Sequence, residues 1–452
     1  MNLELTREFI DNLRLQIENN QEGEVKDLLL ELHAADIAEI MEVLSLEEAK
    51  YIYLLLDGEK ASDVLIELPE DDRRRFLNAL PPEYIARQFI EYMDSDDAAD
   101  ILGELDEDRK KSVLNEIGDV EIAGDIVDLL EYDEESAGGI MAKELVSVNE
   151  NWSVATCLKE ISRQAEDVDD IYYVYVVDDD NKLKGVLSLK KLILNSTSTL
   201  IKNIFNEDVK WVKTDTPQAE VAQIMEKYDL VAIPVVDEIG RLKGRITFDD
   251  VMDVIREEAE RDYNMVSGIT GEVEASDKVW QLTRARVPWL MVGLFGGIMG
   301  AQVIGAHEAS LQKVPATAFF IPLIAAMAGN VGVQSSSIVV QTLASGVRDY
   351  TTPWQKLFKQ LSVAFVTGAI FSVMILLYNL IFSDSLGLTY AVSISLFIVM
   401  TIASVFGSLI PLALHKLKID PAVATGPFIT TLNDVLGLTI YLLISQLFLD
   451  FI

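Results

Sequence analysis

The sequence predicts a multidomain membrane protein: an α-solenoid, two α/β repeats, a linking helix and a five-helix transmembrane domain, in that order. Three observations support this prediction. The 452 residues carry a formal net charge of −36, although half of them are hydrophobic. Residues 287–452 contain six acidic and six basic side chains, so all of the net charge lies before them. The same segment contains five long apolar runs.

The composition excludes several classes of protein. A nucleic-acid partner is not expected, because binding phosphates requires a basic face and this chain is acidic; the charge favours cations as partners. One cysteine, Cys157, and three widely spaced histidines provide neither a disulfide framework nor a zinc site. The first residues are amphipathic and charged, unlike a signal peptide, so we expect the soluble half to be cytosolic.

Residues 1–132 are expected to form an acidic, superhelical stack of short helices. A short unit recurs at 35–37, 61–65 and 99–102, with leucines at helical spacing, as in an α-solenoid. Asp96 and Asp100 are four residues apart, so they share a helix face and repel each other. A solvated acidic face is the alternative interpretation.

A second repeat covers about 145–256. The segment YVVD…LKGV at 175–186 returns as PVVD…LKGR 59 residues later, and each copy has a strand–turn–strand pattern. These units resemble a tandem pair of CBS domains, over 133–203 and 204–258. The resemblance implies binding of an adenine nucleotide, with ATP as a candidate, through a Thr/Ser-x-x-Asp motif after the last strand. The second copy has Thr247 and Asp250, whereas the first has Ser188 and no aspartate.

A linking helix is expected over 259–284, and acidic residues accumulate just before and within it. At helical spacing Asp250, Asp253 and Glu257 share one face, with Glu258 and Asp262 beside it. A charged linker is one interpretation. The place of these acids between a regulatory module and the membrane favours a divalent-cation sensor.

Five apolar runs, at 287–306, 315–345, 357–383, 391–414 and 421–449, define a membrane domain over 285–452. Each is close to or longer than the ~20 residues that span a bilayer. The expected inner loops carry Arg284, Arg286, Arg348, Lys356, Lys359, Lys416 and Lys418, and the outer loops only Lys313. This asymmetry predicts a multi-pass protein of the cell inner (plasma) membrane with its C-terminus outside.

Two of the runs contain polar sequence. In the second, residues 328–337 are small and polar, which predicts a broken helix with Asn330 lining a pathway, or a small-residue packing interface. In the fifth, Asp434 follows Pro421 by 13 residues and should lie near mid-membrane. A carboxylate there costs at least ~2.5 kcal/mol unless it meets water, a cation or a partner.

The surroundings of Asp434 are expected to be rich in oxygen. Thr430, Thr431 and Asn433 adjoin it, and we expect backbone carbonyls freed around Pro427 and the broken second run. Such a hard donor set suits Mg²⁺, Ca²⁺ or Mn²⁺. A single carboxylate per chain favours an ion that keeps much of its water, as Mg²⁺ does.

The order of the parts resembles the MgtE family of magnesium channels. Three segments carry the resemblance: 135–141 (ESAGGIM), 329–334 (GNVGVQ) and 420–434 (DPAVATGPFITTLND). At Ala328 this chain has alanine where the family usually has glycine. The resemblance implies a homodimeric Mg²⁺ importer rather than an enzyme, without catalytic residues, whose pore lies between two membrane domains and holds hydrated Mg²⁺ at Asp434. Mn²⁺ and Co²⁺ are further possible ions.

The resemblance also implies that internal Mg²⁺ binds the acidic domains and closes the pore. Carried onto this sequence, the regulatory positions are Asp63, Asp96, Asp100, the backbone at Gly138, Asp229, Asp250, Asp253, Glu257, Glu258 and Asp262.

Two other functions remain open at this point. One is a proton- or sodium-coupled secondary transporter of divalent cations with Asp434 as the titrating group, although few spans and no inverted repeat count against it. The other is a membrane-anchored nucleotide sensor in which the CBS pair is the functional part.

Overall fold

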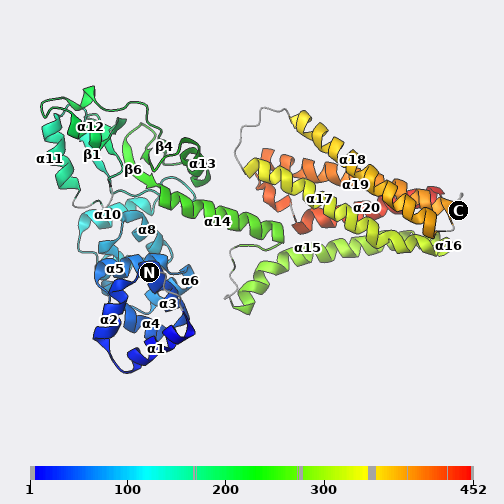
Figure 1. Ribbon diagram of the computed structural model, residues 1–452, viewed down its shortest axis with the longest axis horizontal. Helices are drawn as coiled ribbons and strands as arrows, with labels where there is room; N and C mark the ends of the chain where they lie inside the picture. The colour runs from blue at the N-terminus through cyan, green and yellow to red at the C-terminus, as the bar shows by residue number, and fades with distance from the viewer. Residues whose placement is uncertain are drawn as a thin grey trace. The chain divides into compact units, whose positions relative to one another are not determined.

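The computed structural model describes residues 6–165, 168, 171–271, 273, 278–344, 353–383, 385–424 and 426–448 (Figure 1). The expected inner loop that contains Arg348 lies outside these residues. The chain divides into two compact units, Met1–Ile255 and Arg256–Ile452, which are described separately.

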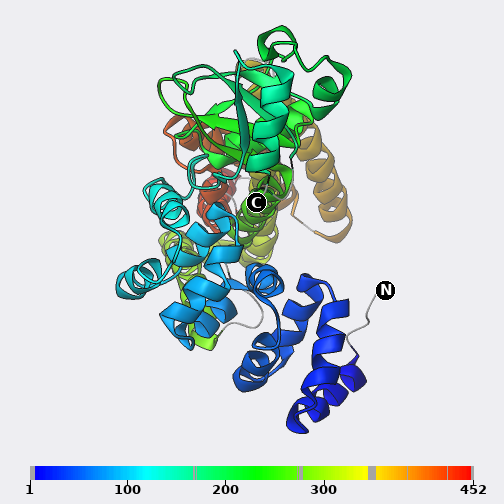
Figure 2. The same ribbon diagram turned by 90° about the vertical axis from the view of Figure 1, so that its left-hand side faces the viewer.

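The first unit begins with a stack of short helices, visible in blue to cyan in Figure 2. Polar caps separate them: Ser45 and Glu48 form a capping box, and Asp57 and Asp106 each accept a backbone N–H at a helix start. The helices are α1 (Arg7–Glu18), α2 (Glu22–Glu31), α3 (Ala34–Val43), α4 (Leu46–Tyr53), α5 (Gly58–Glu67), α6 (Glu70–Asn78), α7 (Pro82–Gln88), η1 (Ile90–Tyr92), α8 (Ser95–Gly103), α9 (Glu107–Leu114) and α10 (Val120–Leu129). The solenoid prediction is confirmed.

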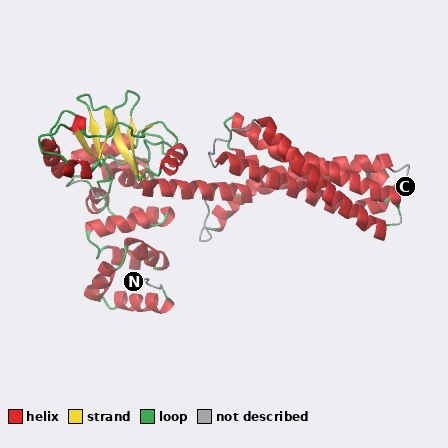
Figure 3. Ribbon diagram, turned by 45° about the horizontal axis from the view of Figure 1, so that its top comes forward, coloured by secondary structure: helices red, strands yellow, loops and turns green. Residues whose placement is uncertain are grey.

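Two small sheets follow, and their strands appear in yellow in Figure 3. Each sheet has three strands, with its first pair parallel and its second antiparallel. The elements are β1 (Val146–Asn149), α11 (Val154–Gln164), β2 (Val174–Val177), β3 (Leu183–Leu187), α12 (Leu189–Leu194), η2 (Ile201–Asn203), β4 (Val212–Lys213), α13 (Gln218–Tyr228), β5 (Ala232–Val236) and β6 (Leu242–Thr247). Identical topology in both copies confirms the repeat.

The second α/β repeat shares one apolar core with the N-terminal helices. Val221, Met225 and Ile246 belong to the same buried cluster as Ile101 and Leu102 of α8, whereas the first repeat has a core of its own. This shared core holds α8 close to the residues that follow β6.

A single helix, α14 (Phe248–Ser267), leaves the second repeat and crosses the boundary between the two units. Residues 248–267 contain no glycine or proline, so nothing interrupts the helix at the expected repeat boundary after 258. Gly268, with φ +75°, follows its last residue. The helix therefore covers only the first part of the predicted linker 259–284, and the next helix begins at Val279.

Among its described residues, the second unit contains five helices that are long and apolar enough to cross a membrane, which confirms the predicted architecture. They are α15 (Val279–Ala306), α17 (Ile321–Ala344), α18 (Pro353–Phe382), α19 (Leu386–Lys416) and α20 (Gly426–Phe448). Short helices α16 (Glu308–Lys313), η3 (Pro315–Phe320) and η4 (Pro421–Ala424) connect some of them.

The predicted break in the second span is wrong, because α17 is continuous through 328–337. The small residues there allow close helix packing. The Ser335 and Ser404 hydroxyls, on α17 and α19, form a hydrogen bond of 2.9 Å between their oxygens. The structure also does not support the expectation that Pro427 breaks a helix and frees carbonyls, since this proline lies in the first turn of α20, where its missing N–H costs little.

Candidate functional site

Asp434 is the ninth residue of α20, about 12 Å along the helix axis from Gly426. Its Oδ1 atom is buried and has no hydrogen-bond partner among the described residues. The carboxylate lies beside Gly329 of α17: a Cβ added to that glycine would be 3.0 Å from Oδ1. A glycine in the second span therefore makes room for the acid of the fifth.

The neighbours of Asp434 have different environments. Asn330 is exposed on the surface of the single chain, a position that can face water or a second chain. Asn433 is only 1% exposed. The Thr430 hydroxyl donates to the Gly426 carbonyl at 2.9 Å, and a Cβ on Gly296 of α15 would overlap the Thr431 side chain. Of the expected oxygen donors, only Asp434 carries a negative charge.

A group of carboxylates, here called the Asp96 cluster, lies at the start of α8. Oxygens of Asp94, Asp96 and Glu144 all lie within 4.8 Å of one another. Ser95 fixes Glu144 by donating its N–H at 3.2 Å and its hydroxyl at 2.8 Å. Three ionised carboxylates this close would repel one another, and either a bound proton or a hard divalent cation would relieve the repulsion.

Asp250 of α14 extends the Asp96 cluster. The pKa of Asp97 is raised to about 7, first by burial and then by repulsion from Asp250, Asp100 and Asp94, while Arg73 opposes the rise. Burial likewise raises the pKa of Asp96, with added repulsion from Asp97 and Asp250. The structure thus brings together predicted residues from the solenoid and from the helix after the second repeat.

Asp250 also binds its own chain at the start of α14. Its Oδ2 accepts the Thr247 N–H at 2.8 Å and the Thr247 hydroxyl at 2.7 Å. The two residues expected to hold a nucleotide therefore contact each other here.

A second group, here called the Asp420 cluster, lies in the other unit. Glu258 and Asp262 are four residues apart on α14. Burial raises the pKa of both carboxyls, and repulsion from Asp420 raises each further, while Arg261 opposes the rise. Sequence analysis did not assign Asp420 to the sensor, because more than 150 residues separate it from α14 and only the fold brings them together.

The remaining predicted positions lie outside both clusters as defined. Asp63 is exposed on α5, and Asp229 is exposed at the C-terminal end of α13 with φ 51°. Asp253 and Glu257 are exposed on α14, on the stretch between Asp250 and Glu258.

Gly138 lies where the N-terminal helices join the α/β repeats. Its N–H donates to the Thr214 carbonyl at 2.9 Å, and a Cβ would lie 2.6 Å from the Tyr132 ring. The adjacent cavity, of about 460 Å³, is lined by Glu131, Tyr132, Asp133, Glu135, Ser136, Thr214, Asp215 and Pro217. Its four carboxylates suit a cation, and Asp215 is a candidate that the sequence analysis missed.

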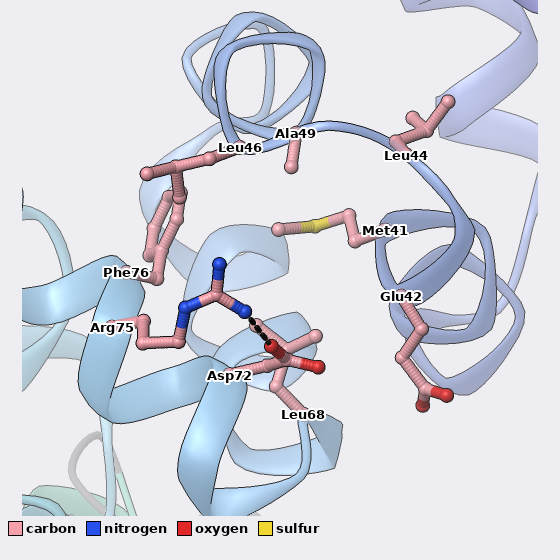
Figure 4. Close-up of a pocket in the computed structure, with 9 residues that line it drawn as sticks. All are labelled: Met41, Glu42, Leu44, Leu46, Ala49, Leu68, Asp72, Arg75 and Phe76. Atoms are coloured by element: carbon pink, nitrogen blue, oxygen red, sulfur yellow. Dashed lines mark hydrogen bonds and ion pairs between the residues drawn. The ribbon is translucent and has the colours of Figure 1, made fainter. Parts of the chain in front are cut away.

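A smaller pocket of about 80 Å³ lies among α3, α4 and α6 (Figure 4). Its walls are mainly apolar, and Arg75 donates to Asp72 at 2.9 Å within it. Because Arg75 pairs with one of its two acids, Asp72, and adds a positive charge, this pocket is a poor cation site.

The end of α14 meets the start of α20. A Cβ on Gly268 would lie 2.6 Å from the Pro427 ring, and a Cβ on Gly426 would overlap the Val266 carbonyl oxygen. Both glycines have positive φ, +75° and +56°. Other residues are disfavoured at these positions by both conformation and contact.

Comparison with known proteins agrees with this architecture. The family model described as a divalent cation transporter matches residues 321–444, the MgtE intracellular N domain matches 32–135, and CBS domains match 137–196 and 201–257. The magnesium transporter MgtE of Enterococcus faecalis is 37% identical over 96% of each chain, and that of Thermus thermophilus 38% identical over 71% of each.

A solved structure of the cytosolic domain of the Mg²⁺ channel MgtE in complex with ATP is also similar. It is 36% identical with a TM-score of 0.51 and covers 54% of this chain and 99% of its own. The match to full-length relatives spans the solenoid, the repeats and the membrane helices. The chain therefore belongs to the MgtE family, a family of multi-pass membrane transporters of divalent cations.

Proposed function

We propose that this protein is a Mg²⁺-selective channel that imports divalent cations. Binding of internal Mg²⁺ closes this channel. The observation that carries the proposal is Asp434, a carboxylate with a buried, unpartnered oxygen inside an apolar helix. Such a group requires a cation or water. The relatives from E. faecalis and T. thermophilus are named magnesium transporters, which supports Mg²⁺ as the ion.

One carboxylate neutralises half of a divalent charge, so we infer that two chains contribute one Asp434 each. The pore then lies between the membrane domains of a homodimer, with Asn330 on its wall. The absence of a caged, many-ligand site around Asp434 among the described residues suits a largely hydrated Mg²⁺.

The two acidic clusters are the proposed sensor. Without Mg²⁺, repulsion within the Asp96 cluster and within the Asp420 cluster favours separation of the elements that carry them. Mg²⁺ binding favours their approach, which is a two-state equilibrium biased by a ligand. Asp63, Gly138, Asp229, Asp253 and Glu257 are proposed as further regulatory positions.

Orientation and nucleotide binding complete the proposal. We infer that the N-terminal domains lie in the cytosol and the C-terminus outside, with the protein in the cell inner (plasma) membrane; the basic residues near Arg284 and Lys416 support this orientation. The ATP complex of a similar cytosolic domain supports ATP as a ligand of the CBS pair near Thr247 and Asp250.

Flux into proteoliposomes tests the pore. Asp434→Ala should abolish Mg²⁺ uptake while dimerisation is kept, with ionophores clamping the membrane potential and the proton gradient. Glu308→Ala, which removes an exposed carboxylate of the same half, is the matched control. Asn330→Leu should reduce flux at unchanged expression. Uptake at the wild-type rate by Asp434→Ala would contradict the assignment, and uptake that requires a proton or sodium gradient would indicate a coupled transporter.

Channel current at rising internal Mg²⁺ tests the sensor. Asp250→Ala with Asp253→Ala should stay open at a Mg²⁺ concentration that closes the wild type. Glu260→Ala, an exposed acid of the same helix outside both clusters, should close normally. Normal closure of the double variant would show that these acids are only a solvated face.

A further inference from the structure

Two consecutive polar residues of α20 pack against two glycines of α17. A Cβ on Gly329 would lie 3.0 Å from Asp434 Oδ1, and a Cβ on Gly332 would overlap Nδ2 of Asn433 and lie 3.1 Å from its Cγ. The two glycines are three residues apart and therefore share one face of α17. Both polar side chains approach that face.

The carboxamide of Asn433 is fully enclosed by protein. The residue is 1% exposed, and neither Oδ1 nor Nδ2 has a hydrogen-bond partner among the described residues. An apolar side chain of similar size would avoid the desolvation penalty of an unpartnered amide. Because no hydrogen bond to the described residues positions the amide, the position of Asn433 is set by its fit into the space that Gly332 leaves.

Helix α17 cannot easily move away from Asn433, because α19 packs closely against its other side. A Cβ on Gly407 of α19 would lie 2.5 Å from the Gly332 carbonyl oxygen and 3.1 Å from Cβ of Ser335. The Ser335 and Ser404 hydroxyls hydrogen-bond at 2.9 Å beside it. Helix α17 is therefore supported from behind by α19 at the level of Gly332.

Consecutive residues of an α-helix project about 100° apart. Asn433 and Asp434 can both approach α17 only within a narrow range of rotations of α20. With the Asn433 amide seated against Gly332, the rotation is set, and the Asp434 carboxylate lies against Gly329 with Oδ1 buried. Removing the Asn433 amide, or adding a side chain at Gly332, would allow α20 to rotate and would displace the Asp434 carboxylate.

We propose that Asn433 is a positioning residue for cation passage: its side chain, seated against Gly332, fixes the rotation of α20 and so the place at which Asp434 meets the ion. This inference rests on the proposed role of Asp434 as the ligand of the permeating cation. Asn433 itself does not touch the ion in this proposal.

The test measures Mg²⁺ flux into proteoliposomes against Mg²⁺ concentration, with the full-length chain. Misfolding lowers the maximal flux because fewer channels work, whereas a displaced ligand changes the concentration at half-maximal flux. We expect Asn433→Ala and Gly332→Ala each to raise that concentration about fivefold or more. In the double variant the added methyl group occupies the space of the lost amide, so its effect should be smaller than the product of the two.

Asn433→Leu separates shape from polarity. Leucine keeps the branch at Cγ, so it should raise the half-saturating concentration less than alanine does. Two matched controls should leave that concentration unchanged: Gly300→Ala, whose Cβ would meet Leu438 at an ordinary 3.5 Å, and Ser445→Ala, which deletes another buried polar group of α20.

The outcomes separate this inference from the proposed function. Wild-type flux in Asp434→Ala overturns the pore assignment itself. Loss of flux there, with an unchanged half-saturating concentration in Asn433→Ala, overturns only the positioning role. An equal rise for leucine and alanine also overturns it, because the polarity of Asn433 would then matter rather than its fit. If Gly332→Ala fails to insert, the two Asn433 variants decide alone.

Discussion

At the scale of single residues, the carboxyl of Asp97 makes the stability of the fold depend on pH. Burial, together with repulsion from Asp250, Asp100 and Asp94 and against the opposing Arg73, raises the pKa of its carboxyl to about 7. In the unfolded chain this carboxyl loses its proton near pH 4. The folded state therefore holds an extra proton between about pH 4 and pH 7, and its stability falls as pH rises through this window.

The first prediction follows from this sign. In EDTA, the thermal midpoint of the purified protein should fall by a few degrees between pH 5.5 and pH 8. Mg²⁺ competes with the proton, so it should raise the midpoint more at pH 8 than at pH 5.5. Asp97→Asn should flatten the EDTA profile, as measured by differential scanning fluorimetry. A profile that Asp97→Asn leaves unchanged would contradict the raised pKa.

At the scale of elements, α15 and α20 pack through one glycine while its neighbour faces open space. A Cβ on Gly296 would overlap the Thr431 side chain, whereas a Cβ on Gly297 would have nothing within 4 Å. The second prediction is that Gly296→Ala costs about 1–3 kcal/mol through overpacking, while Gly297→Ala is neutral or stabilising. Thermal unfolding of both variants in the same detergent checks it. Equal stability of the two would argue against this packing.

Helix α14 carries acids of both clusters on one uninterrupted rod. The third prediction is that Ala259→Pro, which breaks the helix between Asp250 and Asp262 at a cost of about 3 kcal/mol, uncouples internal Mg²⁺ from closure. Flux at low Mg²⁺ should persist, and current should no longer fall as internal Mg²⁺ rises. Ala259→Ser keeps the helix and serves as the control. Unaltered closure in the proline variant would show that α14 need not be continuous.

The same elements show what could be predicted from sequence. Asp434 was found because a carboxylate in an apolar run is a local signal. The course of α17 was misjudged, because Gly329 and Gly332 have low helix propensity, yet side chains of α20 pack into the space that they leave. The approach of Asp250 to the Asp96 cluster, and of Asp420 to Glu258 and Asp262, depends on tertiary packing that no spacing reveals.

At the scale of the whole molecule, an acidic half is joined to a membrane half without net charge. Monovalent salt can only screen the repulsion between acids, with a Debye length of about 10 Å at 0.1 M, whereas a divalent cation can bridge two of them. The sensor proposal therefore requires an effect of Mg²⁺ beyond ionic strength.

The fourth prediction is that millimolar Mg²⁺ protects the acidic half from protease more than NaCl of equal ionic strength does. At fixed protease, added NaCl should raise the Mg²⁺ concentration needed for protection, because screening weakens the attraction. Limited proteolysis of the full-length protein in detergent, with mass spectrometry to locate the cuts, measures both. Equal protection by the two salts would show that both only screen the repulsion between the acids, without bridging by Mg²⁺.

The close approach of Gly426 to the Val266 carbonyl brings two helix dipoles end to end. The last turn of α14 presents the negative end of its dipole to the positive end of the dipole of α20, and the two partly cancel. If α14 withdraws, about half an elementary positive charge is uncovered at the start of α20, some 12 Å along the axis from Asp434. The potential that a cation meets on that side of Asp434 then depends on where the backbone of α14 lies, whatever side chains either helix carries.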